Sequence, residues 1–288
     1  MSKILVFGGT RFFGKALVEQ LLEAGHEVTI ATRGLASDPF GERVDRWKVD
    51  RRDRGSLQSH LHGQSFDVVF DNICYGPDDA KMMVEELEGK VGRYVLTSSK
   101  AVYDKGLNMA ESEFDPYHYD IVYGPYTDFS YAEGKRLAEA VLFQQEAFPV
   151  VAVRFPVVLG SDDYTNRLRF YCDSILHGKP IAVVEGEIDF VLAREAGRFL
   201  MFIGETDFQG PINACSDGAV TTSEIIQLIE LRAGREAILS SDGEETPYNP
   251  YMNMTTSNAK AVELGFSFEK TKEYLPFLID QYIKEAKK

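Results

Sequence analysis

The chain has 288 residues, of which 44% are hydrophobic and 26% are charged, and its formal net charge is −14 at pH 7. This length allows one large domain or two unequal lobes around a cleft, and the apolar content suits a well-packed core. The acidic balance argues against a nucleic-acid-binding surface, because phosphate contacts need clustered Lys and Arg side chains.

The first 160 residues alternate short β-branched runs with amphipathic segments. The expected strands of this part are residues 3–7, 27–31, 46–49, 67–73, 93–98 and 150–155. The expected helices between them are residues 12–24, 54–61, 78–87 and 131–147. This rhythm predicts an α/β fold with a doubly wound parallel sheet and helices on both of its faces.

The rhythm loosens after residue 160. Helices are expected at residues 168–177, 194–203, 222–233 and 271–284, and strands at 181–184, 188–192 and 210–214. We therefore assign residues 1–160, with parts of 186–232, to a cofactor-binding domain. Residues 161–185 and 233–288 are assigned to a smaller C-terminal lobe that binds substrate at the carboxyl edge of the sheet.

No stretch of the chain approaches the length and apolarity of a membrane span. The three cysteines, Cys74, Cys172 and Cys215, are far apart and form no metal-type or redox-type spacing. We expect a reduced, cytoplasmic protein without a metal site.

A glycine loop joins the first expected strand to the first expected helix. Gly8 permits a tight turn, Gly14 lets the helix pack on the strand, and the helix N-terminus presents free N–H groups to a phosphate. This context predicts a dinucleotide site. Its residues are Gly8, Gly9, Thr10, Arg11, Phe12, Phe13 and Gly14.

Two arginines bear on the choice of cofactor. Arg11 stands where such loops commonly have their middle glycine, and Arg33 follows the second strand where an NAD site would commonly have an acid. Two arginines and no acid favour NADP over NAD, because a guanidinium binds a 2′-phosphate well. The alternative for Arg33 is a solvated position at a strand end.

Tyr131 and Lys135 lie one helical turn apart, so their side chains share a helix face. A free tyrosine titrates near ~10, and a neighbouring ammonium favours the phenolate form that general base catalysis needs. The lysine can also hold the nicotinamide ribose, and a serine of the Ser98–Ser99 pair can orient a substrate oxygen. The alternative interpretation is an ordinary pair on a helix surface.

These motifs resemble those of the extended short-chain dehydrogenases/reductases, the NAD-dependent epimerase/dehydratase family, through most of the chain. The matching segments are residues 7–14, 96–103, 130–135, 153–160 and 256–266. The resemblance implies a Rossmann-like fold and a catalytic set of Ser99, Tyr131 and Lys135. It also implies that the cofactor is bound by Asp50 at the adenine and by Ser98, Lys135, Phe155 and Pro156.

The combined hypothesis is an NADP-dependent oxidoreductase or epimerase that transfers hydride at a carbinol or carbonyl carbon. A sugar nucleotide or a similar polar small molecule is the expected substrate. Family 4,6-dehydratases have an Asp–Glu pair after the catalytic serine or threonine, whereas this chain has Lys100 and Ala101 there, which disfavours dehydration. A preference for NADP favours net reduction over epimerisation, since epimerases of the family mostly retain NAD.

The form of the glycine loop is similar to that of a divergent branch near the chloroplast stem-loop RNA-binding proteins. The rival hypothesis is therefore a catalytically silent dinucleotide-binding protein that binds RNA or senses redox state. The net charge of −14 does not favour RNA binding. The family resemblance also implies a homodimer formed through the helix that bears Tyr131.

Overall fold

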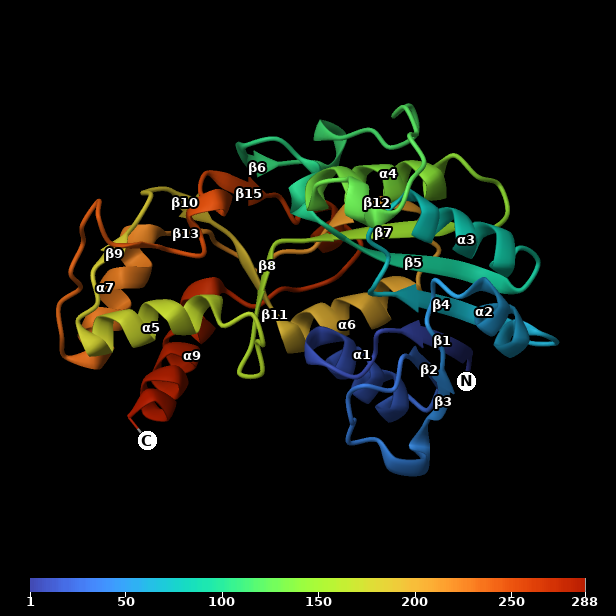
Figure 1. Cartoon of the computed structure of the whole chain (residues 1–288), viewed down its shortest axis with the longest axis horizontal. Coiled ribbons are helices and arrows are strands. Elements are labelled where there is room, and N and C mark those ends of the chain that lie inside the picture. The colour runs from blue at the N-terminus through green and yellow to red at the C-terminus, as the bar shows by residue number, and fades with distance from the viewer. Residues whose placement is uncertain (288) are drawn as a thin grey trace.

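A seven-stranded parallel sheet organises the larger part of the computed structural model, which describes residues 1–287 (Figure 1). Its strand order is β12-β7-β5-β4-β1-β2-β3, so the order reverses at β1, beside β4. The strands are β1 (Lys3–Phe7), β2 (Glu27–Thr32), β3 (Asp45–Lys48), β4 (Phe66–Asp71), β5 (Val91–Ser99), β7 (Val150–Phe155) and β12 (Gly210–Asn213). Open α/β sheets bind ligands at such a reversal, at the carboxyl ends of the strands.

Helices cover both faces of this sheet, because alternate residues of its strands point to opposite sides. Ile4 and Val6 of β1 pack on one side with α1 and α6, whereas Leu5 and Phe7 pack on the other with α2, α3 and α4. The helices are α1 (Phe12–Glu23), α2 (Arg54–Leu61), α3 (Pro77–Leu87), α4 (Tyr131–Phe143) and α6 (Ala193–Gly204). The result is a three-layer arrangement with α3 and α4 above the sheet and α1 and α6 below it in Figure 1.

A smaller lobe lies at the other end of the molecule, where the C-terminal helix α9 packs against α5 (Figure 1). Its own apolar core includes Ile175, Ile188, Ile229 and Ile279. Its helices are α5 (Arg167–His177), α7 (Thr222–Ala233) and α9 (Thr271–Ala286), and the short α8 (Ala259–Glu263) lies near β12. Its short strands are β6 (Gly106–Met109), β8 (Val157–Leu159), β9 (Ile181–Ala182), β10 (Glu187–Ile188), β11 (Phe190–Leu192), β13 (Val220–Thr221), β14 (Glu244–Glu245) and β15 (Met254–Thr256).

The predicted fold class is confirmed, and the strand expected at 210–214 joins the parallel sheet as β12 beside β7. Two expected elements differ. The helix expected over 131–147 ends at Phe143, because the side chain of Gln145 hydrogen-bonds the N–H groups of Ala147 and Phe148 and closes a turn. The strand expected at 188–192 is divided at Asp189, whose carboxylate is bound from outside the strand by Lys100 and Thr256.

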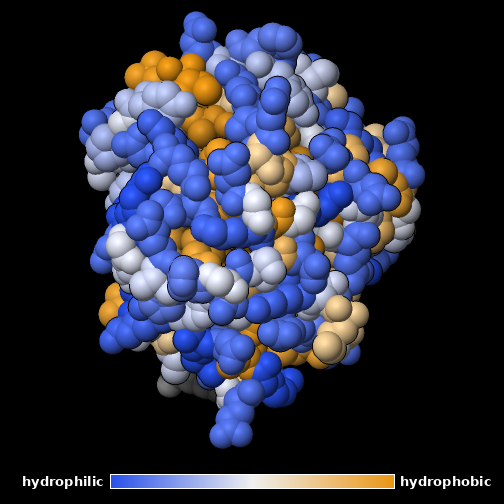
Figure 2. All heavy atoms as spheres, turned by 90° about the vertical axis from the view of Figure 1, so that its right-hand side faces the viewer, coloured by the Kyte–Doolittle hydropathy of each residue, from blue (hydrophilic) through white to orange (hydrophobic). Residues whose placement is uncertain are grey.

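None of the helices described within residues 1–287 is long and apolar enough to cross a membrane. Figure 2 views the molecule from the side of the large sheet, and hydrophilic side chains cover most of that face with scattered apolar ones between them. The three cysteines are free and buried.

Candidate functional site

The glycine loop connects β1 to α1 at the reversal of the strand order. Gly8 has φ +81, and a Cβ atom on Gly14 would lie 2.3 Å from the carbonyl oxygen of Gly8. Residue 14 must therefore be glycine for α1 to begin so close to the strand. The N-terminus of α1 has no side-chain cap and no acidic residue in its first turn, so its N–H groups can bind an anion.

A cleft of about 510 Å³, which we call the glycine cleft, opens beside this loop. Its volume lies within the range of small-molecule and cofactor sites. Its lining residues are Thr10, Arg11, Phe12, Lys15, Ser37, Asp38, Pro39, Asp162 and Tyr164.

Charged side chains that the sequence did not single out line this cleft. The Lys15 ammonium donates to Asp162 at 3.0 Å, and that hydrogen bond raises the pKa of Lys15. Arg46 donates to both oxygens of Asp38 at 2.7 and 3.1 Å, which lowers the pKa of this carboxyl. Asp38 and Asp162 lie in loops without hydrophobic periodicity, so no pattern in the sequence marks them.

The two arginines that favoured NADP are placed differently. Arg11 lines the glycine cleft, whereas Arg33 is exposed after the end of β2 and is not one of its lining residues. The end of β2 has no acidic residue, but Asp38, further along the chain, lines the cleft. The Asp38 carboxylate forms an ion pair with Arg46.

Tyr131 and Lys135 lie at the start of α4, which Ser130 caps by accepting a hydrogen bond from the N–H of Glu133. The Tyr131 side chain is 54% exposed, whereas Lys135 is 1% exposed. The Lys135 ammonium donates to the carbonyl oxygens of Cys74 at 2.7 Å and Thr97 at 2.8 Å, and it lies 5.9 Å from the centre of the Tyr131 ring. An ammonium has three N–H donors, so one remains for a ligand or for Tyr131.

Ser99 is the last residue of β5, and hydrogen bonds on either side of it join this segment to α4. Lys135 binds the carbonyl oxygen of Thr97 before it, and Arg136 donates to the carbonyl oxygen of Val102 after it at 2.6 Å. The Ser99 hydroxyl oxygen accepts from the N–H of Ala101 at 3.2 Å, so its own proton stays available for donation. The fold therefore brings Ser99, Tyr131 and Lys135 to one edge of the sheet.

The remaining predicted cofactor residues lie at the same edge with different side-chain environments. Asp50 is exposed after β3 and accepts a hydrogen bond from the N–H of Arg52. Phe155 and Pro156 are buried at the end of β7. The Ser98 hydroxyl donates to the buried carboxylate of Glu139, on the strand face opposite to Ser99, so its side chain is committed to the interior.

A buried ion pair joins α4 to β7. Arg154 and Glu139 are both 0% exposed, and Arg154 Nη2 donates to Glu139 Oε2 at 2.6 Å. Arg154 also donates to the hydroxyl of Tyr103 at 2.9 Å, while Glu139 accepts from Ser98. Because every charge in this cluster is paired and hydrogen-bonded, it fixes β5, β7 and α4 relative to one another.

Lys100, directly after Ser99, points into the interior instead of the site. Its ammonium donates to Asp189 at 2.5 Å and to the carbonyl oxygen of Met254 at 2.6 Å, and the side chain is 2% exposed. This pair joins the end of β5 to a second sheet, which has four strands in the order β13-β10-β15-β6. The Lys100 side chain therefore lies away from the edge at which Ser99 ends β5, and the expectation that dehydration is disfavoured stays a prediction.

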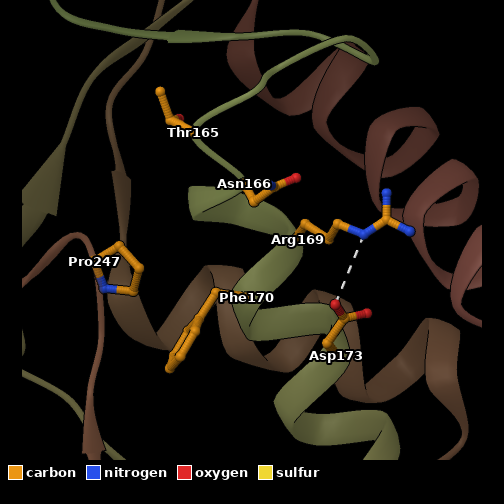
Figure 3. A pocket seen from close by; sticks show the side chains of 6 residues that line it. All are labelled: Thr165, Asn166, Arg169, Phe170, Asp173 and Pro247. Carbon is orange, nitrogen blue, oxygen red and sulfur yellow. Dashed lines mark ion pairs between the residues drawn. The ribbon is translucent and has the colours of Figure 1, made fainter.

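A second cleft, of about 540 Å³, lies along α5 in the smaller lobe (Figure 3). It is lined by Thr165, Asn166, Arg169, Phe170, Asp173 and Pro247. Arg169 is paired with Asp173 and Glu285, at 3.7 and 2.9 Å, so its charge is already balanced.

The fold and the glycine loop define an α/β protein of the Rossmann type. Residues 4–82 match the model of the NAD dependent epimerase/dehydratase family. This match covers the first part of the chain, and over its full length the chain shares the architecture of solved epimerase and dehydratase structures.

The solved structures that the chain resembles share its fold at low sequence identity. UDP-glucose 4-epimerase from Thermotoga maritima, solved with UDP-glucose, has a TM-score of 0.77 and 16% identity over 99% of this chain and 100% of that one. The dTDP-glucose 4,6-dehydratase of Bacillus anthracis, in complex with NAD, has a TM-score of 0.74 and 14% identity over 100% of this chain and 98% of that one.

A curated relative is more similar in sequence. The chloroplast stem-loop binding protein of 41 kDa b from Arabidopsis thaliana is 29% identical over 195 residues. The match covers 63% of this chain and 49% of that protein, so it spans about half the length of the relative.

Proposed function

We propose that the chain is an NADP-dependent oxidoreductase or epimerase that acts at a carbinol or carbonyl carbon of a sugar nucleotide or similar polar substrate. The observation that carries this proposal is the buried Lys135 ammonium, which keeps one N–H donor free one helical turn from Tyr131. A lysine on an ordinary helix surface would be solvated instead of being bound by two backbone carbonyl groups.

The residues of the glycine loop suit a dinucleotide. The close approach of Gly14 to Gly8 would be blocked by any Cβ, and the uncapped N-terminus of α1 can bind a pyrophosphate. Arg11 and Lys15 would bind the adenosine end in the glycine cleft, and Lys135 would bind the nicotinamide ribose. A bound nicotinamide supplies the hydride acceptor or donor.

Tyr131 and Ser99 would both contact the substrate oxygen. Tyr131 is open to solvent and to substrate and lies one helical turn from the Lys135 ammonium, where it would act as the general base or acid for the substrate oxygen. The Ser99 hydroxyl, whose oxygen already accepts from Ala101, would donate a hydrogen bond to the same substrate oxygen. In the reverse direction Tyr131 returns the proton to the reduced carbonyl.

The charges of the glycine cleft support NADP over NAD. Arg11 lies in the cleft, Lys15 is paired with Asp162, and the carboxylate of Asp38 accepts three hydrogen bonds, two from Arg46 and one from the N–H of Phe40. A free carboxylate there would accept the ribose 2′-hydroxyl of NAD. We expect the substitution Arg11→Ser to weaken NADPH binding about tenfold or more while it leaves NADH binding within about twofold.

The test of activity uses sugar nucleotides as substrates. Purified protein is incubated with UDP-glucose and NADP or NAD, and separately with NADPH and a set of keto sugar nucleotides, and the products are separated by chromatography. Turnover is expected to fall about 10²–10⁴-fold in Tyr131→Phe. The control Tyr123→Phe removes the hydroxyl of another exposed tyrosine and should leave turnover unchanged. Equal turnover in wild type and Tyr131→Phe would contradict the proposal.

Stem-loop binding is a second candidate, and the observation that favours it is the name of the Arabidopsis relative. A net charge of −14 gives little attraction to a nucleic acid backbone. Gel-shift titration with an RNA stem-loop at physiological salt separates the two candidates. We expect no specific binding of the RNA, whereas a stem-loop-binding protein would bind it.

The three free, buried cysteines suit a reducing compartment such as the cytoplasm.

A further inference from the structure

Tyr75 lies beside the Lys135 ammonium, in the segment that follows β4. Lys135 donates to the carbonyl oxygen of Cys74, the preceding residue, at 2.7 Å. Gly134 of α4 also lies close to this segment, because a Cβ atom on it would lie 2.4 Å from the carbonyl oxygen of Tyr75. The Tyr75 N–H in turn donates to Asp79 Oδ2 of α3 at 3.1 Å. Helices α3 and α4 thus hold the backbone of Tyr75 from two sides.

The rings of two tyrosines flank the lysine. Lys135 Nζ lies 4.9 Å from the centre of the Tyr75 ring and 5.9 Å from the centre of the Tyr131 ring. The two ring centres are 6.5 Å apart, with an angle of 49° between the planes. Both distances are within the range of a cation–π contact, and the contact to Tyr75 is the shorter.

Lys135 needs this contact because its charge has no carboxylate partner within residues 1–287. The side chain is 1% exposed, so water does not solvate the ammonium. Two carbonyl oxygens satisfy two of its three N–H groups. A desolvated cation with no counter-ion is costly, and an aromatic face offsets part of that cost.

We propose that Tyr75 is a positioning residue of the site, whose ring holds the Lys135 ammonium in place for the nicotinamide ribose and for Tyr131. The aromatic face performs this role, and the hydroxyl group is dispensable. Tyr75 acts through Lys135 and does not exchange a proton itself. Burial raises the pKa of Tyr75 to about 12, which keeps its phenol neutral at physiological pH. The inference rests on the proposed function for the statement that Lys135 binds the cofactor.

The first arm of the experiment needs no cofactor. Lysine labelled with ¹³C at Cε is observed by NMR in wild type, and the Lys135 signal is assigned by its loss in Lys135→Met. The aromatic ring shifts this signal upfield, so Tyr75→Phe should retain the shift and Tyr75→Leu should lose it. As a control, Tyr126→Leu removes a ring that contacts Tyr75 and Arg52 and should leave the Lys135 signal in place. An unchanged signal in Tyr75→Leu would overturn the proposal.

The second arm measures NADPH affinity by fluorescence titration in a double-mutant cycle. Tyr75→Leu should weaken NADPH binding about tenfold in the wild-type background and less than about twofold when Lys135 is already methionine. Tyr75→Phe should stay within about twofold of wild type. Equal weakening by Tyr75→Leu in both backgrounds would show that Tyr75 does not act through Lys135.

The two arms separate the failure of this inference from the failure of the proposed function. If wild-type protein binds neither NADPH nor NADH, the proposed function is wrong, and the NMR arm alone decides whether Tyr75 holds Lys135. If NADPH binds and the Lys135 signal does not respond to Tyr75→Leu, the positioning role is wrong while the proposed function stands.

Discussion

At the scale of single residues, Gly14 is required because no side chain fits at its position, and Glu195 is distinguished by the burial of its carboxylate. Gly14 leaves no room for a side chain against the carbonyl oxygen of Gly8. Glu195 is 1% exposed and accepts hydrogen bonds from the Ser216 hydroxyl at 2.8 Å and from the N–H of Glu269 at 2.5 Å. The sequence identified the first residue, because glycine after a strand is a local pattern. Glu195 could not be identified as buried, because its partners lie 21 and 74 positions away.

We predict that Gly14→Ala lowers the free energy of unfolding by more than about 1 kcal/mol and weakens cofactor binding, because the new methyl group would overlap the Gly8 carbonyl. Urea unfolding and NADPH titration measure the two effects. The control Gly55→Ala lies in α2, where the added Cβ meets only Asp53 Oδ1 at 3.6 Å, and it should stabilise the protein by up to about 1 kcal/mol. Equal effects of the two substitutions would contradict this account of the glycine loop.

Glu195 predicts a pH dependence. Burial raises its pKa above the usual carboxyl value, so the native state favours the protonated form. Its contribution to stability is therefore present below the unfolded pKa and is lost as the pH rises through the folded pKa. We expect Glu195→Gln, which cannot ionise, to gain stability relative to wild type as the pH rises above the usual carboxyl pKa of about 4.3.

Urea unfolding at several pH values tests this expectation for Glu195. The exposed Glu263→Gln serves as the control and should show a pH-independent difference from wild type. A pH-independent difference for Glu195→Gln would show that burial does not control the ionisation of this carboxyl.

At the scale of elements, local patterns predicted the parallel sheet but not the second sheet. The strands of the first 160 residues are bounded by glycines or by helices with apolar stripes, and their buried runs are visible in the sequence. The second sheet instead pairs β6 with β15, segments about 150 residues apart that are only four and three residues long. Such short strands carry no periodic signal, and their pairing is a tertiary effect.

The Lys100–Asp189 pair joins these two sheets, and we predict that Lys100→Met lowers the free energy of unfolding by about 3–5 kcal/mol. The substitution would leave Asp189, 2% exposed, without its cation. Lys81→Met is the matched control, because Lys81 forms an exposed pair with Glu85 at 4.0 Å that contributes less than about 1 kcal/mol. The prediction fails if urea unfolding gives the two variants the same stability.

At the scale of the whole molecule, the candidate site assembles at the edge of the sheet where the large domain faces the smaller lobe. The position of Ser99, Tyr131, Lys135 and the glycine loop at this edge could be predicted, because each lies at a strand end or a helix start within a recognisable motif. Lys15 and Asp162 could not, since their ion pair joins α1 to a loop 147 positions later in the chain.

A ligand bound at such a junction should stabilise the whole fold. We predict that NADPH at about 100 times its dissociation constant adds about 2.7 kcal/mol to the free energy of unfolding. For a chain of this size that corresponds to a rise of about 5–10 °C in Tm. Scanning fluorimetry measures the shift, with Gly14→Ala as the variant in which it should shrink.

Fluorescence titration of cofactor-stripped protein with NADPH and with NADH tests directly whether this chain binds a hydride-transfer cofactor. We expect saturable binding of both, with NADPH bound about tenfold more tightly because of the charge of Arg11 in the glycine cleft. A clear preference for NADH would overturn the assignment of NADP and direct the search to epimerisation of sugar nucleotides. Binding of neither cofactor would contradict the claim that this chain performs hydride transfer.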